Sequence, residues 1–259
     1  MEAAWEIIEG NGPLVAAAIH CGHDVRGELA PLFALNSDDR LREEDPFTDV
    51  WATVASHQIL GGRSRFEVDL NRPREKAVYR RPADAWGLNV WREELPESVV
   101  EESLAIYDDF YADVKRFLQR LVKQHSRIVV FDIHSYTHRR AGEEAPAANP
   151  DENPEINVGT GTMRREVWAN VVDRFLSDFR RYDFHGRSLD VRENVKFRGG
   201  HFPEWIHATF PGQVCVLSIE FKKFFTDEWT GQPDHAVIDA LRAALLSTVV
   251  GIREELAVL

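Results

Sequence analysis

Four short hydrophobic segments along the chain have the pattern of buried β-strands. Two of them, Arg127–Ile133 and Val214–Ile219, are rich in β-branched residues, which favour a pleated sheet. Leu14–Ile19 is short and almost continuously apolar, and Arg65–Leu70 alternates polar and apolar residues. The pattern therefore predicts four buried strands.

Three longer segments have the period of amphipathic helices. The clearest is Pro96–Gln124, where apolar residues recur at three- and four-residue steps. Thr162–Arg181 carries a second apolar stripe, and Asp234–Glu255 carries a third that is opened by Pro233. Because strands alternate with helices, we expect an α/β sandwich.

The segment Arg139–Ile156 differs from these elements. It is rich in Ala, Pro, Glu and Asn, lacks periodicity and follows a predicted strand. Loops of this length are usually functional or disordered, so we expect a long loop near a site. No linker elsewhere indicates a second domain, and residues 1–259 are therefore expected to form a single domain.

Composition and charge argue against several classes of partner. Hydrophobic residues make up 44% of the chain, enough for a sizeable core, and the net charge of −12 argues against nucleic acid or an anionic membrane as the main partner. Two cysteines, Cys21 and Cys215, are too few for a disulfide scaffold. The acidic N-terminus has no signal core, and no apolar run approaches the ~18 residues of a membrane span. We therefore expect a soluble, cytoplasmic protein.

Polar side chains stand at the end of each predicted strand. His20, His134 and Glu220 follow three of the strands directly, and Asn71 with Arg72 follows the fourth. In open α/β sheets ligands bind beyond the carboxyl ends of the strands, so parallel neighbours would bring these side chains into one pocket. Taken singly, each residue also fits an ordinary role at a strand end or turn. The prediction of a site depends on their convergence.

Together these side chains fit the metal-assisted hydrolysis of an amide. Neutral imidazoles suit Zn²⁺, which takes three protein ligands and a water in catalytic sites and lowers the pKa of that water towards ~7. A carboxylate that is not a ligand can take the water's proton and pass it to the leaving amine. Arginine and an asparagine amide can bind a substrate carboxylate or steady an oxyanion. A hydrolase for an amide carried by a small acid needs these parts.

Several motifs resemble the N-formylglutamate amidohydrolase family. SRFEVDLNRP, FDIHSY, FRGGH and LSIEFKKFFTDE occur in the order expected of that family, and IHCG resembles its opening PHSG, with Ile19 in place of the usual proline. The similarity covers most of the chain. It extends more distantly to zinc carboxypeptidases and aspartoacylase-like deacylases. It implies one hydrolase domain with the zinc-exopeptidase fold, a three-layer α/β/α sandwich with a mixed, mostly parallel central sheet.

The resemblance also implies roles for the polar residues. It makes His20 and His134 ligands of one Zn²⁺ per chain and Glu220 the general base. Asn71 and Arg72 would hold the substrate carboxylate.

Two further arginines are candidates for the same site. Arg65 would polarise the scissile carbonyl, although its spacing to DLNR differs by one residue from the aspartoacylase pattern. In RGGH, the paired glycines permit close backbone approach, and we expect Arg198 or His201 to face the pocket. We assign Arg198 to substrate binding.

The second metal ligand is either His23 or Asp45. His23 is three residues after His20, where the carboxypeptidases have glutamate. Asp45 lies in EEDPFTD, which resembles an acidic segment of the formylglutamate enzymes, but an acid there is also typical of a helix N-cap or first turn. We favour His23, because imidazole is the softer ligand and His20 is close in sequence.

The resemblance implies a zinc-dependent amidohydrolase that removes the acyl group from a small acidic N-acyl amino acid such as N-formylglutamate. A carboxypeptidase-like hydrolase of peptides needs the same residues and a roomier pocket, which the loop of residues 139–156 would set. A non-catalytic relative that binds a small acid or a partner protein is the third interpretation. It is kept open because His23 departs from both patterns.

Overall fold

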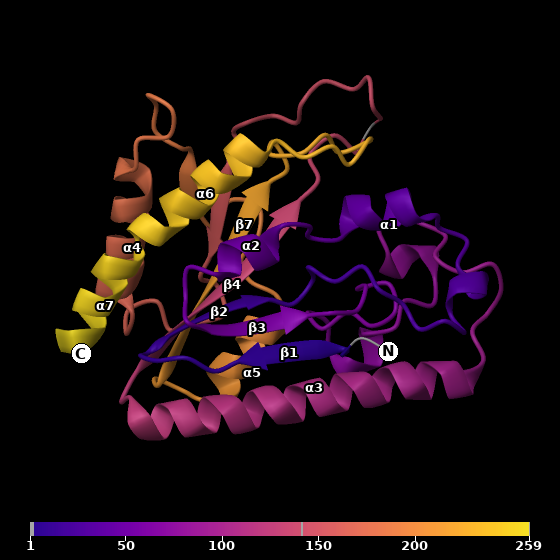
Figure 1. Ribbon diagram of the computed structural model, residues 1–259, viewed down its shortest axis with the longest axis horizontal. Helices are drawn as coiled ribbons and strands as arrows, with labels where there is room; N and C mark the ends of the chain where they lie inside the picture. Colours follow the sequence, from indigo (N-terminus) through magenta and orange to yellow (C-terminus); the bar gives the residue numbers. More distant parts are fainter. Residues whose placement is uncertain (1–2, 141, 259) are drawn as a thin grey trace.

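The central strands of the protein are short, apolar and buried on both faces, as the strands of a parallel sheet must be. The computed structural model describes residues 3–140 and 142–258 (Figure 1). Over these residues the strands form one seven-stranded sheet in the order β1-β3-β2-β4-β7-β5-β6. The strands are β1 (Trp5–Ile8), β2 (Leu14–Ala18), β3 (His57–Gly61), β4 (Ile128–Tyr136), β5 (Ile156–Gly159), β6 (Val191–Glu193) and β7 (Val214–Lys222).

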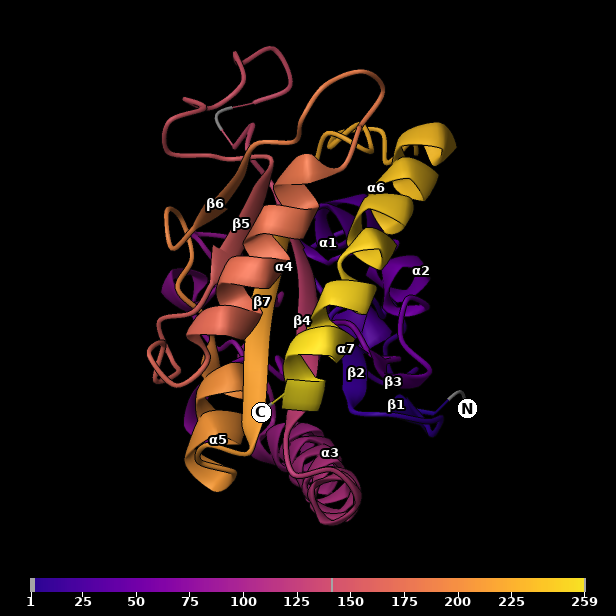
Figure 2. The same ribbon diagram turned by 90° about the vertical axis from the view of Figure 1, so that its left-hand side faces the viewer.

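Helices cover both faces of this sheet (Figure 2). The α-helices are α1 (Ser37–Glu43), α2 (Thr48–Ala52), α3 (Glu97–Gln124), α4 (Ala169–Arg181), α5 (His201–Thr209), α6 (His235–Ser247) and α7 (Val249–Val258). Short 3-10 helices occupy Ala30–Leu32, Arg74–Lys76 and Pro82–Asp84.

Alternation along the strands divides the core into two layers. Val15 and Val130 pack on one face with residues of α3 and α5. Ala16 and Phe131 pack on the other face with residues of α2, α4, α6 and α7. The pairs β3–β2, β2–β4, β4–β7 and β5–β6 are parallel, whereas β1 and β5 run antiparallel to β3 and β7. The expected three-layer α/β/α sandwich with a mixed, mostly parallel sheet is therefore confirmed.

The register of the strands places three polar side chains side by side across the sheet. His134 of β4 lies directly beside Glu220 of β7. Glu220 in turn lies beside Asn157 of β5. His134 and Glu220 have the same parity as the positions of β4 and β7 that pack against α3 and α5, but they lie nearer the carboxyl ends of these strands.

One of the four predicted strands is wrong. Residues 65–70 form turns, in which the N–H groups of Glu67 and Val68 both donate to the Ser64 carbonyl at 2.9 and 3.3 Å. Its alternating sequence does not reflect two faces of a sheet, because residues 66–70 are all buried. The strand in this part of the chain is β3, which ends shortly before it.

The predicted helices are present with altered bounds. The helix expected at Pro96–Gln124 is confirmed as α3, with Pro96 at its N-cap. The helix expected from Thr162 begins only at Ala169, because the residues before it form turns. The third predicted helix is divided at Thr248 into α6 and α7.

By length and composition alone, His235–Val258 would suffice to cross a membrane, with a mean hydropathy of 1.5 over its most apolar 18-residue window. In the fold, 44% of that window is buried. Ile238, Leu241 and Leu245 pack in the core beneath the sheet. These apolar positions thus belong to a core layer, as those of many core helices do.

His207 of α5 completes the hydrogen bonding of β7 where β5 does not reach. β5 pairs with residues 218–221, and the N–H of Val216 donates instead to His207 Nε2 at 3.0 Å. Because Nε2 accepts, Nδ1 carries the proton and faces Thr162 Oγ1 at 3.1 Å. Burial lowers the pKa of His207 from 6.5 to about 4, so the ring is neutral at physiological pH.

We predict that His207→Ala lowers the free energy of unfolding by about 1–3 kcal/mol at neutral pH, because the buried Val216 N–H loses its acceptor. A histidine with a lowered pKa stabilises the fold fully above 6.5 and loses that contribution as the pH falls through about 4. Urea denaturation should therefore show a steeper loss of stability in the wild type than in the variant over this range. Equal slopes would contradict the prediction.

Candidate metal centre

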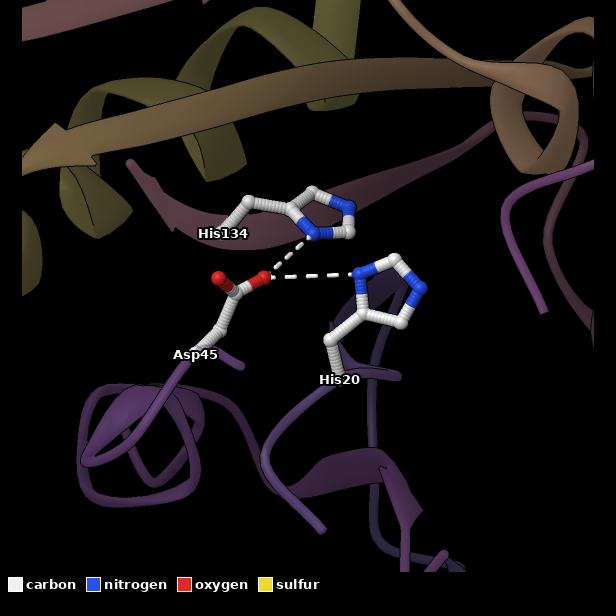
Figure 3. A group of neighbouring side chains, drawn as sticks. All are labelled: His20, Asp45 and His134. Carbon is white, nitrogen blue, oxygen red and sulfur yellow. Dashed lines mark hydrogen bonds and ion pairs between the residues drawn. The ribbon is translucent and has the colours of Figure 1, made fainter. Parts of the chain in front are cut away.

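Three side chains from separate parts of the chain meet at the carboxyl ends of β2 and β4 (Figure 3). His20 follows β2 by two residues, His134 lies in β4, and Asp45 lies between α1 and α2. All three are buried, and one ligand atom from each lies within 4.8 Å of the others. We call His20, Asp45 and His134 the candidate metal group.

Both imidazoles turn Nδ1 towards the same oxygen of Asp45. Asp45 Oδ2 lies 3.0 Å from His134 Nδ1 and 3.4 Å from His20 Nδ1. The opposite ring nitrogens meet buried carboxylates: His20 Nε2 is 2.8 Å from Asp69 Oδ1, and His134 Nε2 is 2.9 Å from Asp132 Oδ1. An ionised carboxylate only accepts, so each Nε2 carries a proton. Each Nδ1 would offer a lone pair once a metal ion replaces the proton that it otherwise shares with Asp45.

This arrangement gathers two ring nitrogens and a carboxylate around a position that suits a proton or a metal cation. Within residues 3–140 and 142–258, the buried His20 Nδ1 has no hydrogen-bond partner. A carboxylate behind a ligating histidine is the usual outer shell of a metal site, where it fixes the ring and its tautomer. Two imidazoles and a carboxylate are donors that suit Zn²⁺ and other divalent transition metals. The residues therefore fit a metal ion.

The electrostatics of the group lead to the same conclusion. Burial alone would raise the pKa of Asp45, but His134 and His20 hold it below its usual value. Burial alone would lower the pKa of His134, but Asp132 and Asp45 raise it well above 6.5. A proton and a metal ion therefore compete for the position between Asp45 and His134.

Asp69 connects the group to a fixed arginine. Its Oδ1 accepts from the Asn71 N–H at 2.8 Å as well as facing His20. Its Oδ2 accepts from Arg65 Nη2 at 2.8 Å and from the Tyr79 hydroxyl. Burial would raise the pKa of Asp69, but Arg65 and His20 keep it well below its usual value. Asp69 thus orients a candidate ligand and a pocket arginine at once.

The candidate metal group lines a pocket of about 450 Å³. Glu220 also lines it and lies beside His134 in the β4–β7 register. The pKa of the Glu220 carboxyl is raised to about 8, chiefly by burial. The charges of Asp45 and Asp132 also raise it, whereas His134 lowers it. A carboxyl that titrates near neutral pH beside a ligand group suits proton transfer. The cationic side chains of the lining are those of Arg65, Arg72, Arg140, Lys196 and Arg198.

The remaining sequence-predicted residues lie on the wall of this pocket. Arg72 is more than a third exposed, with its Nε 3.9 Å from Asp69. Arg198 lines the pocket without an ion pair to any residue that the structure describes. His201 lines the pocket too, at the start of α5.

Asn71 has a structural bond that the sequence did not reveal. Its Oδ1 accepts from the Phe202 N–H at 2.9 Å and so caps the start of α5. A Cβ on Gly200 would lie 2.3 Å from this oxygen, and Gly199 has φ +113, which explains the paired glycines of RGGH. Asn71 also lines the pocket.

His23 lies outside the candidate metal group, and the preference for it as second ligand is corrected. Its Nδ1 contacts Glu44 Oε2, and its Nε2 is 2.8 Å from Ser37 Oγ. The segment after β2 is irregular, so three residues of spacing do not return His23 to the face of His20. Asp45 takes the third place in the group instead.

The two outer carboxylates were missed at the level of sequence. Asp132 precedes His134 by two residues, and side chains two apart in a strand share a face, so the FDIH motif held a usable signal. Asp69 contacts His20, although the two residues are 49 positions apart in the sequence. No spacing rule could have joined that pair.

The loop expected at residues 139–156 lies beside the pocket, although residue 141 is outside the described residues. Arg140 reaches from it to Glu43, donating to both carboxylate oxygens at 3.1 and 2.6 Å. Both residues line the pocket. The loop thereby forms part of the pocket wall.

Comparison with known proteins gives one family. A family model described as N-formylglutamate amidohydrolase matches residues 12–224. A crystal structure of N-formylglutamate amidohydrolase from Ralstonia eutropha has a TM-score of 0.78 at 14% identity, with 99% of each chain covered. The crystal structure of a gene product from Agrobacterium tumefaciens has a TM-score of 0.65 at 17% identity, covering 97% of this chain and 96% of that one. At such identities the structures show a shared fold. No curated protein matches the sequence significantly.

We predict that Asp45→Ala weakens Zn²⁺ binding by more than the about 10–100-fold typical of an outer-shell change, because a candidate ligand atom is lost. His23→Ala is the matched control, and its Zn²⁺ affinity should stay far closer to that of the wild type. Competition with a chromogenic chelator measures both dissociation constants. The reverse ranking would restore His23 as the ligand.

Proposed function

Because the chain belongs to the N-formylglutamate amidohydrolase family, we propose that it is a metal-dependent hydrolase that removes the acyl group from a small acidic N-acyl amino acid such as N-formylglutamate. The observation that carries the proposal is the candidate metal group, with each imidazole backed by a buried carboxylate and Glu220 in the same pocket.

The metal in this proposal is one Zn²⁺ per chain, held by His20, Asp45 and His134. Two histidines and one carboxylate leave a fourth position for water, as in catalytic zinc sites with three protein ligands. When bound, such an ion acidifies water and polarises a carbonyl oxygen. The buried His20 Nδ1, which has no hydrogen-bond partner among the described residues and lies 3.4 Å from Asp45 Oδ2, supports this assignment.

Glu220 is the proposed general base. It lies beside His134 in the register and outside the candidate metal group, which leaves its carboxyl for proton transfer. Its pKa of about 8, raised by burial, would fall when a divalent cation adds positive charge nearby. The carboxylate takes a proton from the attacking water as the oxygen–carbon bond forms. It returns that proton to nitrogen as the carbon–nitrogen bond breaks.

Arg65 is proposed to polarise the scissile carbonyl. Asp69 and the Glu43 carbonyl, at 2.8 and 3.3 Å, hold two of its nitrogens in place. Its Nε is buried without a hydrogen-bond partner among the residues described, and the guanidinium lies 4.9 Å from the centre of the Trp86 ring. A fixed cation of this kind stabilises developing negative charge without reorganising.

Arg72 and Arg198, with the Asn71 amide, are proposed to bind the acid end of the substrate. Neither guanidinium has a carboxylate at hydrogen-bonding distance in the described chain, whereas Arg65 and Arg140 are each engaged by one. A guanidinium without a hydrogen-bonded carboxylate can bind a substrate carboxylate in a bidentate manner, and this favours an anionic substrate.

A substrate panel tests the proposal. Protein supplied with Zn²⁺ is assayed for release of free amine from N-formyl, N-acetyl and N-succinyl amino acids with acidic and neutral side chains. We expect hydrolysis of acidic N-acyl amino acids. Cleavage of peptides alone would favour a carboxypeptidase-like enzyme. If the protein takes up no zinc and hydrolyses none of these substrates, a non-catalytic relative is favoured.

We predict that Glu220→Gln lowers kcat by about 10²–10⁴-fold, because the amide cannot accept the water's proton. The zinc content should stay at the wild-type level, since Glu220 is not in the candidate metal group. Glu204→Gln, which removes another carboxylate of the same pocket, is the control and should keep most of the activity. Equal losses in the two variants would argue against the role of Glu220.

We predict that Arg198→Met raises KM for an acidic N-acyl amino acid by roughly tenfold or more, because a charge-assisted hydrogen bond of about 1.5–3 kcal/mol is lost. The KM of a neutral N-acyl amino acid should change little, so the preference for the acidic substrate falls. Steady-state kinetics on the two substrates measure this. An equal change in KM for both substrates would be the contrary result.

A further inference from the structure

A buried lysine lies next to the segment that carries Asp45. Lys223 follows β7 directly, and only 3% of its surface is exposed. Its Nζ donates to the carbonyl oxygens of Glu44 at 2.6 Å and Arg42 at 2.5 Å. These carbonyls lie at the end of α1 and just after it, so the ammonium fixes the chain immediately before Asp45.

The other polar groups of Asp45 are already held by neighbours. Its N–H donates to the His20 carbonyl at 3.0 Å, and its Oδ1 accepts from Ser135 Oγ at 3.2 Å. Its own carbonyl accepts from Thr48 Oγ1 at 2.6 Å. The carbonyl of the preceding peptide, that of Glu44, is the one that Lys223 holds.

The backbone of Lys223 connects this segment to a second ligand. Its N–H donates to the Tyr136 carbonyl at 3.0 Å, at the end of β4 and two residues after His134. Lys223 also stands three residues after Glu220. One residue therefore joins the strand of His134, the strand of Glu220 and the segment of Asp45.

An ammonium in this position is not explained by core packing. Burial lowers the pKa of Lys223 below its usual value, and the nearby carboxylates of Asp45, Glu43 and Glu228 offset only part of that lowering. A methionine of similar length would fill the same space without the desolvation of a charge. What the lysine adds is donors for two backbone carbonyls beside a candidate ligand.

We propose that Lys223 is a positioning residue that holds the Glu44 carbonyl so that the Asp45 carboxylate faces the two imidazoles. This inference rests on the proposed function, because it concerns a ligand of the proposed metal. The adjacent Lys222 provides a matched comparison. Its Nζ donates to the Asn153 carbonyl at 3.0 Å instead.

The first arm of the test uses metal-free protein. Hydrogen–deuterium exchange is measured for residues 43–48 in the wild type, Lys223→Met and Lys222→Met. We expect faster exchange in this segment in Lys223→Met alone, because the Glu44 and Arg42 carbonyls lose their donor. Lys223→Gln keeps a shorter donor, so its exchange rate in this segment should lie between those of the wild type and Lys223→Met. It takes the place of the methionine variant if that variant does not fold.

The second arm measures the dissociation constant for Zn²⁺ by chelator competition in the same proteins. We expect Lys223→Met to bind about 10–100-fold more weakly, as outer-shell changes do. The melting temperature of its metal-free form should stay close to that of the wild type. Lys222→Met should match the wild type in both measurements.

Unchanged exchange in residues 43–48, or an unchanged dissociation constant despite faster exchange, would overturn the proposal. Faster exchange throughout the chain with a lower melting temperature would also overturn it, because Lys223 would then serve the fold in general. If the wild type itself binds no divalent cation, the proposed function fails. The exchange measurement then decides alone whether Lys223 fixes the segment of Asp45.

Discussion

The carboxylate of Asp45 between two imidazoles is the contact on which the site depends. Buried acceptor atoms that face one another are unfavourable without positive charge between them, so the surrounding structure must hold them there. Buried carboxylates fix the far side of each ring, through Asp69 for His20 and Asp132 for His134. The group therefore keeps its geometry through contacts that lie behind it.

The rigid and the irregular parts of the fold contribute differently to this group. β2 and β4 are paired and buried, so the backbones leading to His20 and His134 are fixed by the sheet. Asp45 comes from a connection between two short helices, where secondary structure cannot hold it. The side chains around it supply that support, and the dense hydrogen bonding of residues 43–45 is the result.

Much of the site follows from the sequence, because strand ends can be recognised from local patterns. His20, His134 and Glu220 were placed in this way, and the sheet brings the strands that carry them together. The choice between His23 and Asp45 could not be made from local patterns, since the His134–Asp45 contact spans 89 positions and belongs to no periodic element. Residues 65–70 were misjudged for a related reason, as an irregular segment buried throughout can alternate in sequence without forming two faces.

The row of His134, Glu220 and Asn157 also shows how the site depends on strand register. Asn157 accepts from the N–H of Lys196 at 2.8 Å and thereby holds part of the pocket wall to the same row. Inserting one residue early in β7 would move Phe221 to the other face of the sheet and withdraw the acid from the pocket. Core residues and the pocket acid thus occupy alternate positions of β7. An insertion or deletion of an odd number of residues in this strand would therefore remove the acid from the pocket, whereas an even number would preserve its face.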